Sequence, residues 1–109
     1  MTQTDFLTAT AVVSGRPARR NGREVRRSEN GRMDVLLHGA PLLSVIPEAA
    51  TIEIDGGALP TRKSTRAANA VLASFTPCRV LTRNSRWYIR TGDGELLDYT
   101  GRIAEVNIA

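Results

Sequence analysis

The residues best suited to chemistry lie at 61–66, where a helix is expected to begin. The segment reads Thr61-Arg62-Lys63-Ser64-Thr65-Arg66 and combines hydroxyl groups, three basic side chains and the unpaired backbone amides of a helix start. Amides at a helix N-terminus together with positive charges bind anions, phosphate above all. The same hydroxyls can instead simply cap the helix while the charges stay in solvent. The sequence leaves both interpretations open.

A second basic group lies in two β-prone runs joined by a tight turn at Asn84-Ser85, since Asn84 tolerates the positive φ of such turns. With this register Val80 faces Ile89 on an apolar side. The opposite side carries an aromatic ring among arginines: Arg79, Arg83, Arg86, Tyr88 and Arg90. Such a face can stack bases while its arginines bind phosphates. It can equally be a solvated face on which arginine stems cover apolar side chains.

A third basic segment spans residues 15–31 and is almost free of large apolar side chains. It is expected to be a basic loop or arm, or a long polar hairpin centred on Asn21-Gly22. An arm of this kind can become ordered on a polyanion, whereas a solvated loop contacts nothing. Its candidates for phosphate contact are Arg19, Arg20 and Arg23.

The charge balance favours an anionic partner. The 109-residue chain has 15 Lys and Arg against 11 Asp and Glu, a formal net charge of +4. All of the basic residues except Lys63 are arginines, which grip phosphate with two donors and stack on bases. The basic residues are clustered and the acidic ones are scattered, which indicates a polyanion-binding surface. A GC-rich genome produces the same arginine bias without any function.

Conventional catalytic and metal sites lack their residues in this chain. A single histidine, His38, and a single cysteine, Cys78, exclude a multi-residue His or Cys metal site and an internal disulfide. Neither a P-loop nor a GxGxxG motif occurs. We therefore expect no enzymatic activity, no cofactor, no metal, and a buried thiol at Cys78.

The order of elements predicts an α+β fold in which one central helix, at about residues 62–75, packs on one face of an antiparallel sheet. Strands are expected at 8–13, 33–38, 42–46, 51–55, 78–82, 87–90, 95–99 and 102–106. The length suits one domain, 1–109, with the basic loop or arm at about 15–31. No apolar run approaches the roughly 20 residues of a membrane helix, and the N-terminal residues lack secretory features, so a cytoplasmic setting without a membrane partner is expected.

Residues 51–90 resemble a recurring pattern in small bacteriophage and prophage proteins. In that pattern an isoleucine-rich strand ends in glycine, a Thr/Ser-rich segment with Arg and Asn opens a short helix, and a hairpin carries Trp-Tyr. The matching residues are Gly57, Thr61, Ser64, Thr65, Arg66, Asn69, Trp87 and Tyr88. The resemblance brings no established activity. It implies a small phage accessory protein that works in the bacterial host cytoplasm by binding.

The sequence therefore favours a protein that binds the phosphate backbone of DNA or RNA with little sequence specificity. The expected contacts are Arg62, Lys63, Ser64, Thr65, Arg66, Arg79, Arg83, Arg86, Tyr88, Arg90, Arg19, Arg20 and Arg23. Two alternatives remain open. One is a module that inhibits or redirects a host or defence protein through its arginine faces or a sheet edge. The other is an oligomeric structural component.

Overall fold

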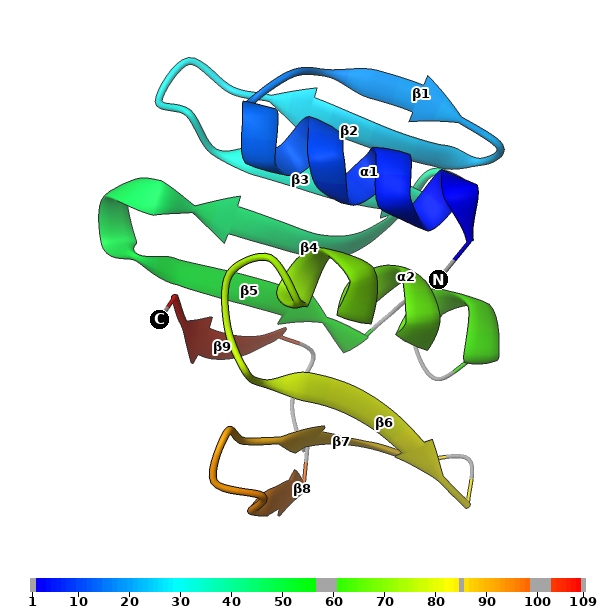
Figure 1. Ribbon diagram of the computed structural model, residues 1–109, viewed down its shortest axis with the longest axis vertical. Helices are drawn as coiled ribbons and strands as arrows, with labels where there is room; N and C mark the ends of the chain where they lie inside the picture. The colour runs from blue at the N-terminus through cyan, green and yellow to red at the C-terminus, as the bar shows by residue number, and fades with distance from the viewer. Residues whose placement is uncertain (1, 57–60, 85, 99–102, 109) are drawn as a thin grey trace.

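The computed structural model describes residues 2–56, 61–84, 86–98 and 103–108, and shows an α+β fold with two α-helices and two antiparallel sheets (Figure 1). The radius of gyration is 12.7 Å, close to the ~13 Å of a compact domain of about 100 residues. The predicted α+β class is confirmed, with a second helix and a second sheet beyond the prediction. No described helix is long and apolar enough to cross a membrane.

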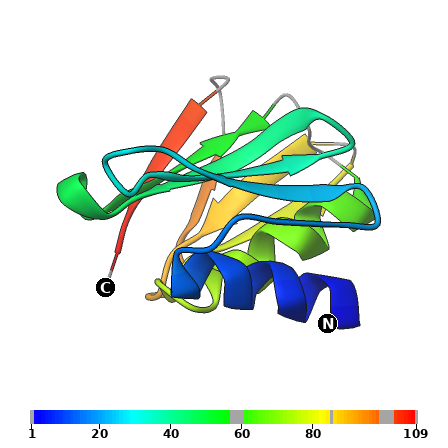
Figure 2. The same cartoon turned by 90° about the horizontal axis from the view of Figure 1, so that it is seen from above.

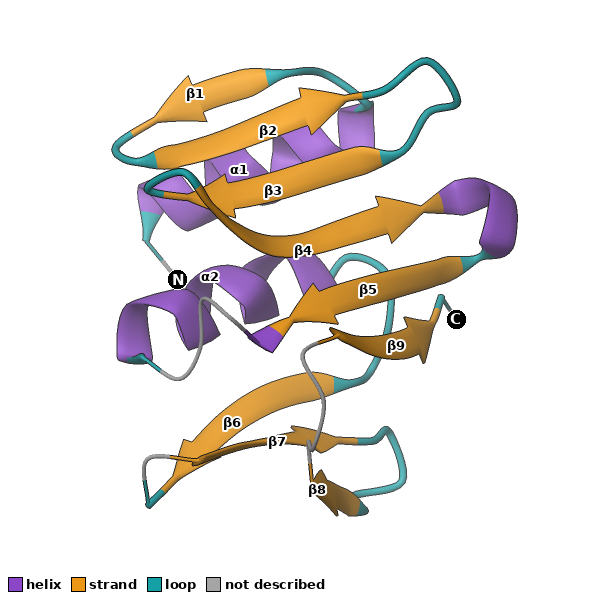
Figure 3. Cartoon of the chain, turned by 180° about the vertical axis from the view of Figure 1, so that it is seen from behind, coloured by secondary structure: helices purple, strands orange, loops and turns teal. Residues whose placement is uncertain are grey.

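Six strands form the larger sheet in the order β1-β2-β3-β4-β5-β9. Their bounds are β1 Ala18–Arg20, β2 Arg23–Arg27, β3 Met33–Leu37, β4 Ala40–Ile46, β5 Thr51–Asp55 and β9 Ile103–Asn107, with the short 3₁₀ helix η1, Pro47–Ala49, between β4 and β5. Helices α1, Gln3–Ser14, and α2, Arg62–Leu72, cover one face of this sheet (Figure 2). No described element covers the opposite face (Figure 3).

Three strands form the smaller sheet, in the order β6-β7-β8: β6 Arg79–Arg83, β7 Arg86–Arg90 and β8 Leu96–Asp98. The predicted register of the hairpin is confirmed, since Val80 pairs with Ile89 and Asn84 has a φ of 54°. Its apolar side carries Val80, Trp87 and Ile89 into the same core as the buried side chains of α2 and β5. Parts of several predictions lie outside the described residues: Ser85 of the turn, Gly57 of the phage-type pattern, and Tyr99 and Arg102 of the last two predicted strands.

The prediction of a strand at 8–13 is wrong, because these residues belong to α1. The β-branched residues of the run suggested a strand, but the flanking residues specify a helix. Thr2 caps its start, with Oγ1 accepting from the Asp5 amide at 3.1 Å. Gly15, with a φ of 68°, closes its end in the left-handed conformation that glycine adopts readily. Local propensity is a weak signal beside caps at both ends and a buried face.

The basic segment at 15–31 is mainly a β-hairpin, β1 and β2, and not a loop or arm. The polar hairpin centred on Asn21-Gly22 was the correct alternative. Asn21 and Gly22 have φ values of 49° and 80°, the positive pair that a two-residue hairpin turn requires. The single apolar residue of β2, Val25, is buried to 2% exposure in the main core, and it anchors an otherwise polar hairpin.

Helix α2 begins at the predicted residue and ends earlier than predicted, at Leu72. The face that packs into the core carries Ala67, Ala68, Val71 and Leu72, which share one side of a helix because of their spacing. Residues 73–75 continue as a turn in which the amides of Ser74 and Phe75 bond carbonyls only three residues back. Hydrogen bonds to the carbonyl three residues back are common in the last turn of an α-helix.

Asn69 connects α2 to the smaller sheet. Its Nδ2 donates to the Val80 carbonyl and its Oδ1 accepts from the Val80 amide, both at 2.8 Å. Asn69→Ala leaves two backbone groups of a buried residue without partners, so the free energy of unfolding should fall by roughly 2–3 kcal/mol. Urea denaturation followed by circular dichroism measures this loss. A change below about 0.5 kcal/mol, the scale of ordinary surface substitutions, would contradict the connecting role.

Candidate nucleic-acid interface

One end of the molecule, at the right of Figure 1, gathers the starts of both helices and the β1–β2 and β3–β4 turns, together with the Arg83/Arg86 end of the β6–β7 hairpin. We call it the basic end. Among the described residues, its exposed basic side chains are Arg20, Arg62, Lys63, Arg66, Arg83 and Arg86. Three segments that are far apart in the sequence therefore contribute cations to one surface.

The two carboxylates that lie at this end among the described residues are buried. Asp5, in the first turn of α1, is 0% exposed, and Asp55, at the end of β5, is 8% exposed. Four exposed carboxylates lie instead at the opposite end, in the loop after β2, in η1 and in the turn after β7: Glu29, Glu48, Asp93 and Glu95. Exposed arginines, Arg16, Arg27 and Arg90, accompany these carboxylates, so the opposite end is mixed in charge, whereas the described exposed charges of the basic end are all cations.

The start of α2 is held by a reciprocal cap. Thr61 Oγ1 accepts from the Ser64 amide at 3.0 Å, and the Thr61 amide donates to Ser64 Oγ at 3.2 Å. Ser64 is fully buried and its hydroxyl is used by the cap, so it serves the helix and not a ligand. Thr65 is half-buried. Arg62 and Lys63 project from the first turn and are exposed.

Lys63 links the start of α2 to both neighbouring turns. Its Nζ lies 3.1 Å from Nε2 of His38, which accepts the hydrogen bond when the lysine is charged. The His38 amide in turn donates to the Gly22 carbonyl at 2.6 Å. The His38 ring lies so close over Gly22 that any Cβ there would collide with it. Sequence reasoning missed this role of His38; its position in the His38-Gly39 turn was the available signal.

A buried ion pair lies beneath the basic end. Arg23 Nη2 is 2.7 Å from Asp5 Oδ1, and the two side chains are 6% and 0% exposed. Arg66 Nε, 3.9 Å from Asp5 Oδ2, adds a nearby charge without a hydrogen bond. Within the described part of the chain, neither Asp5 oxygen receives a well-directed hydrogen bond. The attraction between the two opposite charges therefore holds Asp5 and Arg23 together. Arg23, expected to contact nucleic acid, is therefore buried and structural.

The hairpin arginines divide between two ends of the molecule. Arg83 and Arg86 pair across the strands at the basic end, and Arg79 pairs with Arg90 at the other. The Arg79 guanidinium donates to the carbonyls of Thr76 and Cys78, both at 2.6 Å, and so fastens the chain entering β6. The structure thus brings Arg83 and Arg86 to the side of the α2 start, and places Arg79 and Arg90 away from it.

Arg19 and Arg20 are neighbours with different surroundings. Arg19 Nη2 lies 3.1 Å from Glu24 Oε2, and Arg26 Nε lies 2.9 Å from the same oxygen. Hydrogen bonds from Arg26 and then Arg19 hold the pKa of Glu24 below its usual range. Glu24 therefore stays ionised at neutral pH and offsets charge on Arg19. Arg20, next to the Asn21-Gly22 turn, is exposed and belongs to the basic end.

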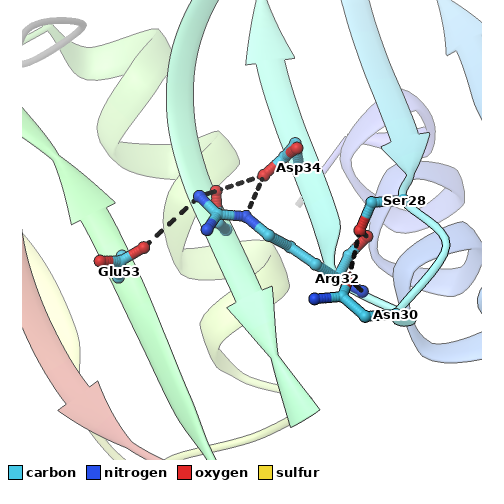
Figure 4. Close-up of polar contacts among 6 residues, drawn as sticks. Ser28, Asn30, Arg32, Asp34 and Glu53 are labelled. Atoms are coloured by element: carbon cyan, nitrogen blue, oxygen red, sulfur yellow. Dashed lines mark hydrogen bonds and ion pairs between the residues drawn. The ribbon is translucent and has the colours of Figure 1, made fainter. Parts of the chain in front are cut away.

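Charged side chains on the uncovered face of the larger sheet pair with one another. Arg32 reaches across three strands, with its Nε 3.0 Å from Asp34 and its Nη2 3.4 Å from Glu53 (Figure 4). The same Nη2 donates to Ser44 Oγ at 3.2 Å. Because these charges already have partners, this face is a weaker candidate for an anionic ligand than the basic end.

Comparisons with protein-family models, with curated proteins and with solved structures find no match to this chain. In the described part of the chain, no group of three or more His, Cys, Asp or Glu side chains is placed to hold a metal ion. The case for a function therefore depends on the charge and geometry of the basic end.

Proposed function

We propose that this protein binds nucleic acid through the basic end and contacts the phosphate backbone with little sequence preference. One observation carries the proposal. The exposed cations Arg20, Arg62, Lys63, Arg66, Arg83 and Arg86 lie on one end, where nearby carboxylates are buried or already paired. A surface of this kind gains free energy by displacing the counterions that surround a polyphosphate. The proposed setting is that of a phage-type accessory protein in a bacterial cytoplasm.

The spread of the cations favours a polymer over a small anion. They lie on β1, on α2 and on the β6–β7 hairpin, which follow one another along the long axis of the molecule in Figure 1. That axis measures 34 Å. A single phosphate can reach the cations of one element, whereas a nucleic-acid backbone can cross all three.

Tyr88 is the residue of this interface that we expect to distinguish single strands from double strands. The ring is half-buried beside Leu81, on the side of the smaller sheet that carries Arg83 and Arg86. Stacking of a base on an aromatic ring contributes roughly 1–3 kcal/mol, and only unpaired bases are free to stack. Tyr88→Ala should therefore weaken binding of a single-stranded oligonucleotide about tenfold or more and leave duplex binding nearly unchanged, as measured by fluorescence anisotropy. If the wild type and Tyr88→Ala bind single strands with equal affinity, bases do not stack on Tyr88.

Nuclear magnetic resonance of the labelled protein, titrated with an oligonucleotide, tests the location of the interface. We expect the amide signals of residues 20–22, 38, 62–66, 83 and 86 to shift together, and those near Glu48 and Asp93 at the opposite end to stay in place. Shifts confined to the uncovered sheet face around Arg32 would reject the basic end as the interface.

A further inference from the structure

Helix α1 presents an uncharged, apolar surface to solvent. Its outward side carries Phe6 and Val13, each 59% exposed, and Leu7, 37% exposed. Its one ionisable residue, Asp5, is buried on the inward side. A surface helix normally opposes its buried face with charged residues, and a helix that is apolar on all sides is normally buried on all sides. The outward face of α1 therefore has the character of an interface.

A hollow of about 300 Å³ lies beside this face, between α1 and α2. Small residues form much of its lining: Ala9, Thr10 and Ser14 from α1, Ala70 from α2, and Ala73 and Ser74 from the turn that follows α2. Phe6 and Val13 stand at its margin. One surface thus carries both projecting apolar side chains and an apolar recess, the self-complementary combination that a two-fold symmetric contact requires.

We infer that this face binds a second copy of the same chain, with the two α1 helices antiparallel and the two-fold axis close to Thr10. Thr10 lies between Phe6 and Val13 along the outward face. About such an axis, Phe6 of each copy meets Val13 and the recess of the other copy.

Charge selects the antiparallel arrangement. Both helices start at the basic end, so parallel pairing would bring Arg62, Lys63 and Arg66 of the two copies together. Antiparallel pairing instead places each basic end beside the mixed end of its partner, where the exposed carboxylates Glu29, Glu48, Asp93 and Glu95 accompany Arg16, Arg27 and Arg90, so the like-charge repulsion is much smaller. It also sets the positive start of each α1 against the negative end of the other. Both basic ends remain available to bind a polyanion.

The size of the contact requires more than α1. A stable interface buries about 800 Å² on each partner, and a 12-residue helix is only about 18 Å long and about 10 Å wide with its side chains. The exposed residues Ala73 and Ser74, which line the same recess, extend the surface onto the turn after α2. A second copy is favoured because it matches both the projecting side chains and the recess of this face, and the tests below distinguish it from a membrane.

Solution mass tests the pairing. The wild-type chain of 11.9 kDa should behave as a dimer by light scattering in the micromolar range, and Phe6→Lys/Val13→Lys should be a monomer with an unchanged circular dichroism spectrum. Ile103→Lys is the matched control, because Ile103 is an exposed apolar residue, at 50%, on β9 and far in the fold from α1. It should remain a dimer.

Cross-linking tests the geometry. In a Cys78→Ser background, Thr10→Cys should be joined to its counterpart by a short thiol-reactive linker, and Gln3→Cys should not, since antiparallel pairing carries the two helix starts apart. A wild-type monomer up to hundreds of micromolar would overturn the inference, as would efficient linking of Gln3→Cys alone. A monomer that binds neutral phosphatidylcholine vesicles through Phe6 would also overturn it and assign the face to lipid. None of these outcomes depends on nucleic-acid binding.

Discussion

An Asp5→Ala variant is expected to lose about 3–5 kcal/mol of unfolding free energy, because it leaves the Arg23 guanidinium charged in a site where that side chain is 6% exposed. Arg66, 48% exposed and 3.9 Å from the same carboxylate, stays hydrated when that carboxylate is removed and so adds little to the loss. Loss of a negative charge from the first turn of α1 adds a smaller cost, roughly 0.3–1 kcal/mol. Urea denaturation of the variant and the wild type gives the difference.

A double variant that replaces both Asp5 and Arg23 provides the control. Because paired buried charges can be replaced by apolar side chains of similar size at little cost, Asp5→Ala/Arg23→Leu should recover much of the stability lost by Asp5→Ala. A double variant as unstable as the sum of the two single variants would show that Asp5 and Arg23 act independently. A loss below about 1 kcal/mol for Asp5→Ala, the size of an exposed pair, would contradict a buried ion pair.

The Arg62→Glu/Lys63→Glu variant should bind nucleic acid at least about a hundredfold more weakly than the wild type. Both side chains project from the capped start of α2 and are exposed. Each lost charge-assisted contact costs about 1.5–3 kcal/mol, and each 1.4 kcal/mol is a factor of ten in affinity. Anisotropy titrations with a labelled single strand measure the loss.

A charge-matched control variant tests whether binding depends on the basic end or only on the net charge of the protein. Arg27→Glu/Arg90→Glu changes the net charge by the same amount, and both residues are exposed at the opposite end of the molecule. Its affinity should stay within about threefold of the wild type, because charges beyond a Debye length of about 8 Å are largely screened at physiological salt. Equal losses in the two variants would mean that binding follows net charge and not the basic end.

Elements with strong local signals could be predicted from the sequence. The two-residue turn at Asn84 set the β6–β7 register, and the hydroxyl at Thr61 marked the start of α2. Both depend on interactions within a few residues, which a sequence displays directly. Helix α1 was missed because the run at 8–13 is rich in β-branched residues, and the caps at Thr2 and Gly15 that specify a helix lie outside that run.

The candidate site was only partly predictable because sequence clusters do not correspond to surface clusters. The segment at 62–66 contributes three exposed cations to the basic end as expected, but the hairpin arginines divide between two ends. Arg23 lies three residues from exposed Arg20, yet it points into the molecule toward Asp5. That pairing joins α1 to β2, and long-range contacts of this kind follow from strand order and helix placement, which no local pattern in this sequence specifies.

The salt dependence of binding is the most direct test of the basic end as a nucleic-acid interface. Each phosphate contact on a single strand contributes about 0.7 to the slope of log affinity against log salt concentration. The six exposed cations of the basic end therefore predict a slope near −4 for the wild type if all of them contact phosphates. Micromolar or tighter binding at physiological salt with such a slope would support the interface. No binding even at low salt would contradict it and would direct attention to an acidic protein partner.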